Sequence, residues 1–420
     1  MVDIADFNAY FHEDFQSLSM GIEVHVGLEH FKNLLLIEGN MDSAGTIRIA
    51  MLGASLTIRG GITSVEKLVL ENTPENISII HLPTFDHGPI FHNTIVYWNT
   101  LGKLCRLIFT GQIDAIHIHF SDRGSTIRKL LPCIIAIIFR RPFILHSHCA
   151  VHREFYASIP RIAREVINAV FRKCAYFISL SKSWDDYFTE CLKLSPGRHG
   201  VLYNPVKISP NVFQKSHGPL VTFVFLGVLG SYTGANASVK TNKKITQMPG
   251  QNKGGFDCIK AFALLSGELR EKSRMVIAGS GDIQGARDLI IFLGLENKIS
   301  VRPWLNPRER DELLFLSDVF LLPSYNEGLP MSMLEAMAFG LPVLVTPVGG
   351  IPEIVTHGHE GLIVLPGHID ELSHAMGLLI GDKKKREEMG KQALLRVAPL
   401  CIENYMDSLR SIYHKASCLR

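Results

Sequence analysis

Two glutamates beside a predicted helix start are the residues best suited to hold a ligand. Glu327 and Glu335 lie in the segment 323–343, PSYNEGLPMSMLEAMAFGLPV, which runs from a predicted strand through a turn into a short helix. Pro330 stands where a first helical residue is expected, with Gly328 before it. The free N–H groups of such a helix start form an anion site suited to a phosphate.

The spacing of the two carboxylates fits a ligand that carries both phosphate and hydroxyl groups. Glu335 follows Glu327 by about two helical turns, so both can flank one nucleotide sugar while contacting different hydroxyls. Carboxylates accept paired hydrogen bonds from vicinal diols. The alternative is that Glu335 is a solvated helix residue and Glu327 interacts only with the helix dipole.

Histidines are frequent in the first half of the chain. His117, His119, His146 and His152 raise the question of a metal site, but no Asp or Glu completes a convincing ligand spacing with them. The sequence therefore predicts no metal. An isolated histidine after a strand more often forms a structural hydrogen bond.

The elements that must position these residues alternate between short apolar strands and helical segments. This alternation predicts an α/β fold with parallel, doubly wound sheets. The predicted strands are 47–52, 77–82, 115–118, 142–146, 176–180, 221–226, 274–278, 299–301, 319–322, 343–346 and 362–364.

The chain divides into two series of strands. Its 420 residues exceed one ordinary core, and a polar, proline-containing stretch follows Asn204. We therefore predict two Rossmann-like domains facing across a cleft, where a ligand is expected. The predicted segments are an N-terminal extension (1–45), a first domain (46–205), a second domain (206–395) with an inserted polar loop (231–252), and a C-terminal helix (396–420) that packs back as a brace.

The amino-acid composition argues against several classes of protein, among them nucleic-acid-binding, secreted and membrane-spanning proteins. A net charge of +3 is too small to indicate a nucleic-acid partner, and 46% hydrophobic residues indicate a folded globular protein. The eight cysteines are scattered without C-x-x-C spacing, which fits a reducing cytoplasm. The acidic first twenty residues do not resemble a secretory signal. The apolar run 130–139, LLPCIIAIIF, is too short to span a bilayer and predicts a buried helix.

The E-x7-E arrangement of Glu327 and Glu335, followed by VGGIPEIV (348–355), resembles glycosyltransferase family 4. The resemblance covers 220–415 and, more thinly, 46–205. Its supporting segments follow in the family's order: FLGVLG (225–230), KGGFDCIKAF (253–262), VIAGSGD (276–282), VRPWL (301–305) and HGHEGLIVLPG (357–367).

That resemblance implies a retaining, metal-independent transferase of the GT-B fold that needs no cofactor. It would move a sugar from a nucleoside-diphosphate sugar to an acceptor hydroxyl. By the same resemblance Glu335 binds the donor ribose, Lys253 binds the pyrophosphate, and Glu327 with Gly328 to Met331 meets the sugar and distal phosphate. A lysine there would stabilise the negative charge that grows on the leaving group.

The first domain carries thinner matches. RGGITSV (59–65) resembles the family's glycine loop, and HIHFSDRGS (117–125) and LHSHCAVHREFY (145–156) resemble acceptor-side segments. His148 aligns with a histidine that contacts the donor sugar. The resemblance thus assigns catalysis to Glu327, His148 and Lys253, and donor binding to Gly60, Gly61, Lys253, Gly328, Leu329, Pro330, Met331 and Glu335.

Two segments depart from the family's pattern. Val228 stands where the family has an arginine, which removes a cation from the pyrophosphate; Lys240, Lys243 or Lys244 of the inserted loop is a candidate replacement. Cys149 replaces the glycine after His148, and Ala150 and Val151 replace small polar and acidic residues.

A basic and apolar surface is a further expectation. Arg140 and Arg141 adjoin the apolar run 130–139, and the segment 161–173 mixes arginines with isoleucine, valine and phenylalanine. Such a surface suits peripheral contact with an anionic membrane, whereas the alternative is a pair of core helices with charged outer faces.

Together, the motifs and the family resemblance predict a retaining glycosyltransferase of polysaccharide or lipid-linked glycan biosynthesis. Its expected partners are a nucleotide-sugar donor and a glycan or lipid-linked glycan acceptor, and its expected place is the cytoplasm or the inner face of the plasma membrane. The alternatives are a nucleotide-sugar epimerase on a related fold and a non-catalytic protein that binds sugar nucleotides.

Overall fold

Two parallel sheets of six strands each form the framework. The computed structural model describes residues 45–208, 218–230 and 253–418. The first sheet has the strand order β2-β1-β3-β4-β5-β6 and the second has the order β12-β11-β10-β7-β8-β9. Their strand pairs are parallel throughout. The prediction of an α/β fold with two doubly wound sheets is confirmed.

The N-terminal half (46–208) contains the first sheet and its connecting helices. Its elements are β1 (Ile47–Gly53), α3 (Gly61–Glu71), β2 (Ile77–Pro83), α4 (Ile90–Phe109), β3 (Ala115–Phe120), α5 (Gly124–Ile138), β4 (Phe143–Ser147), α6 (His152–Ser158), α7 (Arg161–Phe171), β5 (Tyr176–Ser179), α8 (Lys182–Leu192) and β6 (His199–Val201).

The C-terminal half (218–418) contains the second sheet and ends in three consecutive helices. Its elements are β7 (Val221–Leu229), α9 (Gly255–Leu264), α10 (Gly267–Glu271), β8 (Ser273–Gly281), α11 (Ile283–Phe292), β9 (Ile299–Arg302), α12 (Pro307–Phe315), β10 (Val319–Leu322), α13 (Met331–Ala338), β11 (Val343–Val345), α14 (Ile351–Ile354), β12 (Gly361–Ile363), α15 (Ile369–Gly381), α16 (Lys383–Val397), the 3-10 turn η2 (Ala398–Leu400) and α17 (Ile402–Ser417).

Each predicted strand is present, with ends that shift by at most three residues. Strand β6 was not predicted, because its sequence HGV is short and lacks an apolar pattern; it forms by pairing with β5. The predicted extension 1–45, apart from its last residue, and the inserted loop 231–252 lie outside the described residues.

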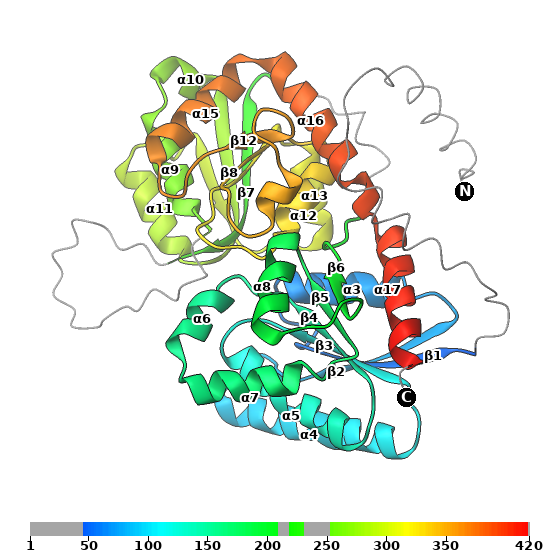
Figure 1. Cartoon of the computed structure of the whole chain (residues 1–420). Coiled ribbons are helices and arrows are strands. Elements are labelled where there is room, and N and C mark those ends of the chain that lie inside the picture. The colour runs from blue at the N-terminus through cyan, green and yellow to red at the C-terminus, as the bar shows by residue number, and fades with distance from the viewer. Residues whose placement is uncertain (1–44, 209–217, 231–252, 419–420) are drawn as a thin grey trace, which may run out of the picture. The chain divides into compact units, whose positions relative to one another are not determined.

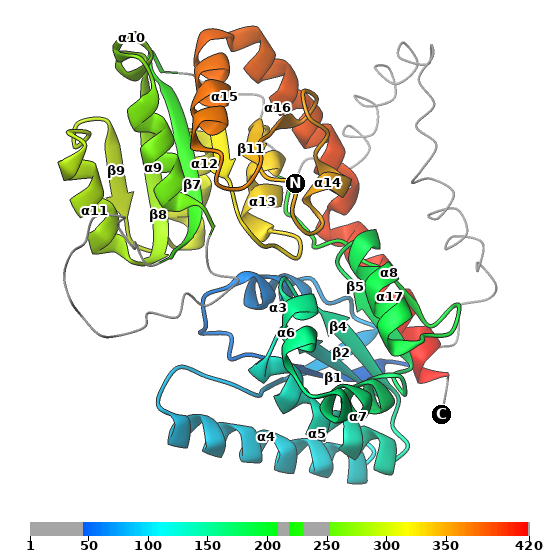
Figure 2. The same ribbon diagram turned by 60° about the vertical axis from the view of Figure 1, so that its left-hand side comes forward.

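Helices cover both faces of each sheet. In the C-terminal half α9, α11 and α15 lie on one face and α12 and α13 on the other (Figure 1). In the N-terminal half α4, α5 and α7 lie together on one face (Figure 2). Helix α17 contacts α3, β1 and β3, and its Tyr405, Leu409 and Tyr413 join the buried cluster on the opposite face of the first sheet.

Helix α5 contains the apolar run that was predicted to be buried. The prediction holds for one side of the helix, where Cys133 and Ala136 are fully buried. It is wrong for Ile137 and Ile138, because their side chains point away from the sheet and are exposed. Among the described residues, no helix is both long and apolar enough to cross a membrane.

The strand order fixes where ligands can bind. In an open parallel sheet the crevice lies at the carboxyl ends of the two strands between which the connections diverge. In the second sheet these strands are β7 and β10, and in the first sheet they are β1 and β3. The segments that follow these four strands are therefore the first candidates for a functional site.

Helix α13, which follows β10, is held in place by close packing against α16. An added Cβ at Gly390 of α16 would lie 2.2 Å from the carbonyl oxygen of Gly340, at the end of α13. That distance is incompatible with any side chain unless the backbone moves.

We therefore expect Gly390→Ala to destabilise the protein by about 1–3 kcal/mol, although glycine-to-alanine changes usually favour helices. The matched control is Gly102→Ala in α4, where nothing lies within 4 Å of the added Cβ. This control should be neutral or stabilising by up to about 1 kcal/mol. Urea unfolding midpoints measure both effects, and equal shifts in the two variants would contradict the packing argument.

Candidate functional site

The carboxyl ends of β7 and β10 bring Lys253 and Glu327 into direct contact. Lys253 Nζ donates a hydrogen bond to Glu327 Oε2 at 2.6 Å, and Ser324 Oγ donates to Glu327 Oε1 at 2.7 Å. Glu327 is buried, with 5% of its surface exposed. A buried carboxylate is tolerated when it is paired and hydrogen-bonded, so these contacts hold the ionised side chain at the switch point of the sheet.

Glycine makes the approach of Lys253 possible. Gly254 has φ +77°, and an added Cβ would lie 2.3 Å from the Pro323 carbonyl oxygen. Only glycine adopts this conformation at such a distance. The K-G-G sequence therefore lets the chain return from β7 close to the end of β10.

The start of α13 differs slightly from its prediction. The helix begins at Met331, and Pro330 is the N-cap residue instead of the first helical residue. Pro330 also has no N–H group, so its predicted role in donor binding can only be to shape the turn. The amides of Met331 and the two residues after it, Ser332 and Met333, belong to the first helical turn, where N–H groups have no intrahelical partner.

The turn before α13 is fixed by hydrogen bonds to its carbonyl groups. Gly350 N–H donates to Gly328 O at 2.7 Å, and Asn204 Nδ2 donates to Leu329 O at 2.8 Å. The carbonyls thus point away from the helix start. These two carbonyl oxygens are therefore engaged, and the positive end of α13 is a group suited to an anion.

Glu335 lies on α13 and forms an ion pair with Arg310, a residue that belongs to none of the predicted site motifs. Arg310 Nη1 of α12 donates to Glu335 Oε1 at 2.7 Å, and Arg310 also contacts Asp311. Burial raises the pKa of Glu335 to about 7, although the charge of Arg310 acts to lower it. In the sequence, Arg310 stands in the charged run NPRER, which resembles the solvated start of any helix.

The glycine loop of the N-terminal half follows β1. Gly60 has an extended backbone and nothing within 4 Å of an added Cβ, while the nearest atom to such a Cβ at Gly61 is Met331 Cγ at 3.7 Å. Neither strain nor crowding inside the protein therefore requires glycine here. The open space at Gly60 and the lack of crowding at Gly61 are compatible with the predicted approach of a donor phosphate.

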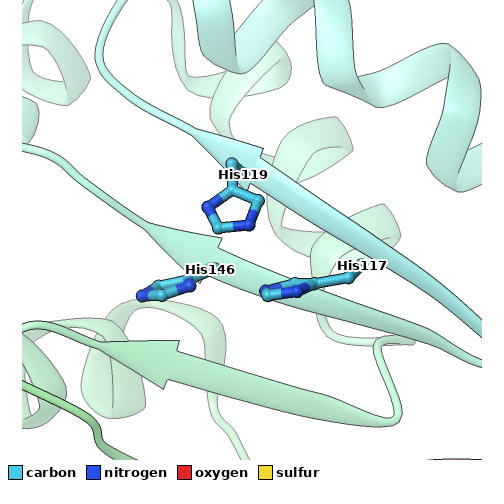
Figure 3. A group of neighbouring side chains, drawn as sticks. All are labelled: His117, His119 and His146. Atoms are coloured by element: carbon cyan, nitrogen blue, oxygen red, sulfur yellow. The ribbon is translucent and has the colours of Figure 1, made fainter. Parts of the chain in front are cut away.

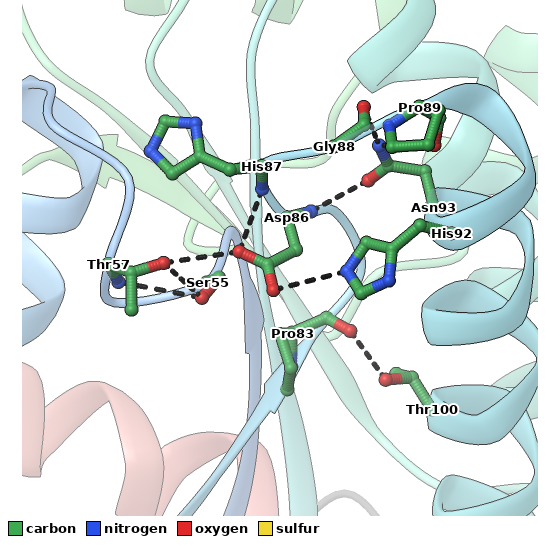
Figure 4. A network of polar contacts seen from close by, with 10 residues as sticks. All are labelled: Ser55, Thr57, Pro83, Asp86, His87, Gly88, Pro89, His92, Asn93 and Thr100. Atoms are coloured by element: carbon green, nitrogen blue, oxygen red, sulfur yellow. Dashed lines mark hydrogen bonds and ion pairs between the residues drawn. The ribbon is translucent and has the colours of Figure 1, made fainter.

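A polar network anchors this loop to the segment after β2 (Figure 4). Asp86 Oδ1 accepts hydrogen bonds from Thr57 Oγ1 at 3.1 Å and from the His87 N–H at 2.7 Å. These bonds lower the pKa of Asp86, the bond from His87 having the largest effect. Asn93 Oδ1 in turn accepts the Asp86 N–H at 2.8 Å, so helix α4 also holds the network in place.

His148 follows β4, on the same face of the first sheet as α17. Its Nε2 lies 2.9 Å from His119 Nδ1. Burial lowers the pKa of His148 to about 3, so the imidazole is neutral near pH 7. His148 is therefore suited to hydrogen bonding and not to supplying a positive charge.

Three of the four histidines considered as metal ligands come together. His117 and His119 of β3 and His146 of β4 place one ring nitrogen each within 4.8 Å of one another (Figure 3). His152 lies elsewhere and contacts the Tyr156 and Tyr187 rings. The H-x-H spacing of His117 and His119 in β3 is the sequence signal for this cluster, because alternate residues of a strand share a face.

The two halves meet at the turn that precedes α13. An added Cβ at Gly328 would lie 2.8 Å from the Cys149 carbonyl oxygen. The Met331 side chain joins the buried cluster that α17 forms with the first sheet. The side chain of Met331 is thus a packing group, and only its backbone can serve the predicted donor contact.

The segments that depart from the family's pattern have identifiable structural roles. The Ala150 and Val151 N–H groups donate to Asp122 Oδ2 at 2.9 and 3.0 Å, which closes the loop between β4 and α6. Val228 lies on β7, paired with β8. Lys240, Lys243 and Lys244, proposed to compensate for Val228, lie outside the described residues.

A groove of about 1030 Å³ lies beside α6, α7 and α8 of the N-terminal half. Arg153, Arg161, Arg164, Tyr156 and Tyr187 are among the residues that line it. The Arg153 guanidinium lies over the Tyr187 ring, 5.0 Å from its centroid. Glu165, Asp186 and Glu190 also line the groove, which therefore combines three cations and three carboxylates with aromatic surface.

Several known proteins resemble this chain in sequence. The family model of glycosyl transferases group 1 matches residues 241–396. An uncharacterized glycosyltransferase of Methanocaldococcus jannaschii is 35% identical over 119 residues, which are 28% of this chain and 30% of that protein. The N,N'-diacetylbacillosaminyl-diphospho-undecaprenol alpha-1,3-N-acetylgalactosaminyltransferase of Campylobacter jejuni is 31% identical over 137 residues, 32% of this chain and 35% of that protein. The chain thus spans about a third of the length of these curated relatives.

Similarity of fold extends over both halves. The crystal structure of Anabaena HepE in complex with UDP and glucose superposes with a TM-score of 0.64 and 18% identity, and the match covers 87% of this chain and 98% of that one. Residues 241–396 are thus similar to the glycosyl transferases group 1, and the architecture of the chain is the GT-B fold.

Proposed function

We propose that this protein is a retaining glycosyltransferase that moves a sugar from a nucleoside-diphosphate sugar to an acceptor hydroxyl. The observation that carries the proposal is the contact of Lys253 with Glu327 beside the start of α13. A cation, a helix start and a carboxylate thereby meet at the switch point of the second sheet. These groups suit, in turn, a diphosphate, its distal phosphate and the hydroxyls of a sugar.

In the proposed reaction Lys253 and the amides at the start of α13 stabilise the leaving diphosphate. The bond between the anomeric carbon and the phosphate oxygen breaks while the acceptor oxygen bonds to that carbon on the same face. The acceptor proton passes to the distal phosphate. Because a side-chain cation and helix amides neutralise the developing charge, the transfer needs no metal at the diphosphate.

The proposed partners rest on the groove of the N-terminal half and on the named relatives. HepE binds UDP-glucose in its crystal structure, and the Campylobacter jejuni relative is named for a diphospho-undecaprenol acceptor. Arg153, Arg161 and Arg164 of the groove can donate hydrogen bonds to the anionic part of such an acceptor, and the neighbouring Glu165, Asp186 and Glu190 can accept from its hydroxyls. We therefore place the acceptor, a glycan or lipid-linked glycan, on that side.

If the acceptor is lipid-linked, the protein must reach the membrane that holds it. We therefore propose that the protein binds peripherally to the cytoplasmic face of an anionic membrane. Large apolar side chains are exposed on α4 and α7, among them Ile90 (88%), Phe91 (75%) and Ile162 (80%). Exposed basic residues stand on or just after the helices that form this face: Lys103, Arg106, Arg140, Arg161, Arg172 and Lys173. Apolar groups that insert among lipid headgroups and cations that attract them are the features of an interfacial surface.

The decisive experiment is a thermal-shift screen of nucleoside diphosphates and sugar nucleotides, followed by measurement of nucleotide release. A ligand of the folded state raises the melting temperature. With the donor so identified, release that depends on an acceptor supports glycosyl transfer. Epimerised donor without acceptor would instead support an epimerase, and binding without turnover would support a non-catalytic protein.

In the same assay Glu327→Gln should lower kcat by about 100-fold or more, the scale of removing one electrostatic group from an active site. An amide cannot accept from Lys253 and Ser324 as the carboxylate does. Glu312→Gln, on the exposed face of α12, is the matched control and should retain the normal rate. Normal turnover in Glu327→Gln would refute the role of this residue.

The pKa of Glu335 predicts a pH dependence of donor binding. A carboxylate accepts two hydrogen bonds from the ribose hydroxyls, and protonation removes part of this capacity. Affinity for the sugar nucleotide, whose diphosphate does not titrate in this range, should therefore fall as pH falls through about 7. Calorimetry between pH 5.5 and 8.5 measures the midpoint.

Two variants test the origin of this midpoint. Arg310→Gln removes the charge that lowers the pKa of Glu335, so the midpoint should move to higher pH by about one unit. Glu335→Gln should abolish the dependence and weaken binding. A midpoint near 7 that survives in Glu335→Gln would assign the titration to another group.

The membrane contact has its own test. Binding to vesicles that contain phosphatidylglycerol should weaken about tenfold when Ile90 and Ile162 are both replaced by glutamate, because apolar insertion is lost and negative charge is added. Phe292→Glu, equally exposed on α11, is the matched control and should bind normally. Equal binding of all three proteins would rule out this surface.

A further inference from the structure

The buried face of the first sheet contains a group of imidazoles that the proposed transfer does not use. His117, His119 and His146 expose 0%, 2% and 0% of their surface and lie among apolar residues of β1, β3 and α17. Their rings are packed together, with centroid distances of 4.2 to 5.4 Å. Three polar rings on a core face require a physical explanation.

Each ring has nitrogen atoms that no neighbouring group satisfies. Among the described residues, Nε2 of His117, Nε2 of His119 and both ring nitrogens of His146 have no hydrogen-bond partner. Buried polar atoms without partners are costly and uncommon in native proteins. These unpaired atoms occur in all three rings of the cluster.

The Nδ1 atoms of His117 and His119 form hydrogen-bond contacts of the kind that metal-binding histidines make. His117 Nδ1 lies 2.8 Å from Tyr413 Oη, and His119 Nδ1 lies 2.9 Å from His148 Nε2. A histidine that binds a metal through one nitrogen normally uses the other as a donor to a neighbouring group, which fixes its tautomer and orientation. Both histidines of β3 therefore have the outer contact in place and Nε2 left for an ion.

We propose that His117, His119 and His146 bind a zinc ion. Three neutral imidazoles are a known zinc ligand set that leaves a fourth position for a small ligand. The ligand nitrogens lie within 4.8 Å of one another, and Zn–N bonds of about 2.0–2.1 Å in tetrahedral geometry need about 3.4 Å between them. Small rotations of the rings close that difference.

The rings are also in the protonation state that a metal requires. Burial lowers the pKa of His117 to about 3 and lowers those of His119 and His146 well below the usual value. Lone pairs are therefore available at neutral pH. The imidazole ligands favour zinc over magnesium or calcium, which prefer oxygen.

Binding would connect the ion to the loop that holds His148. With zinc on Nε2, the proton of His119 must lie on Nδ1, so His119 donates to His148 Nε2 and His148 carries its own proton on Nδ1. The ion would also join β3 to β4 and, through Tyr413, to α17. His119 thus becomes a positioning residue for His148, and the site is distinct from the metal-independent diphosphate site.

The test uses the full-length chain without a histidine tag. Elemental analysis after gel filtration should find close to one zinc per chain, and a chelator should lower the melting temperature. His146→Gln should reduce the zinc content at least tenfold. His152→Gln is the matched control, since His152 is also buried with Nε2 unpaired but lies outside the cluster, and it should keep the metal.

A second measurement serves if His146→Gln does not fold. Cobalt(II) added to chelator-treated wild-type protein should give the intense visible absorption of tetrahedral coordination, which hydrated cobalt lacks. Zinc retained in folded His146→Gln, or no zinc and no cobalt spectrum in the wild type, would overturn the proposal. Neither result bears on the transfer proposed above, which donor binding and nucleotide release test separately.

Discussion

Two acidic side chains that are largely removed from water set the arrangement of the polar groups in the C-terminal half. Glu327 is satisfied by Lys253 and Ser324, and Glu335 by Arg310. Because an unpaired buried charge is strongly destabilising, each partner must come from a neighbouring segment at the same edge of the sheet. The order of β7 and β10 provides the first pair, and the packing of α12 beside α13 provides the second. In the proposed function the donor replaces some of these partners when it binds. The two acids are therefore already held in position before the donor arrives.

Close backbone packing explains why the same short turns contain so much glycine. Gly349, with φ +57°, would place a Cβ 2.0 Å from the Glu327 carbonyl oxygen, and Gly328 lies against Cys149 of the other half. In the same segment the Glu353 carboxylate accepts the Lys182 and Ser183 N–H groups at the start of α8. The V-G-G-I-P-E segment therefore supports the turn that carries Glu327 and also caps a helix of the N-terminal half.

Local sequence patterns predicted the two sheets. They did not predict most of the contacts between side chains that lie far apart in the sequence. Alternation of apolar residues was sufficient for the strands, but β6 depends on its neighbour β5 for its conformation. The motif around Glu327 and Glu335 indicated the two acids, yet Arg310 gives no sequence signal apart from charge. The histidines of β3 and β4 were predicted not to bind a metal, because no Asp or Glu completes a ligand spacing with them, although His117 and His119 alternate along β3 and so share a face.

The C-terminal half contributes positively charged groups to the proposed site, whereas the N-terminal half contributes a neutral histidine. The proposed reaction gives a reason for this difference. The C-terminal half supplies Lys253 and the positive end of α13, which suit a diphosphate. The N-terminal half supplies His148, whose pKa of about 3 keeps it neutral. Positive charge develops on the sugar ring as the bond to the leaving group breaks, so a protonated imidazole beside the anomeric carbon would oppose the reaction. In the proposed reaction a neutral His148 would offer the sugar a hydrogen bond without that repulsion. The burial of His148 beside His119 and His146 lowers its pKa.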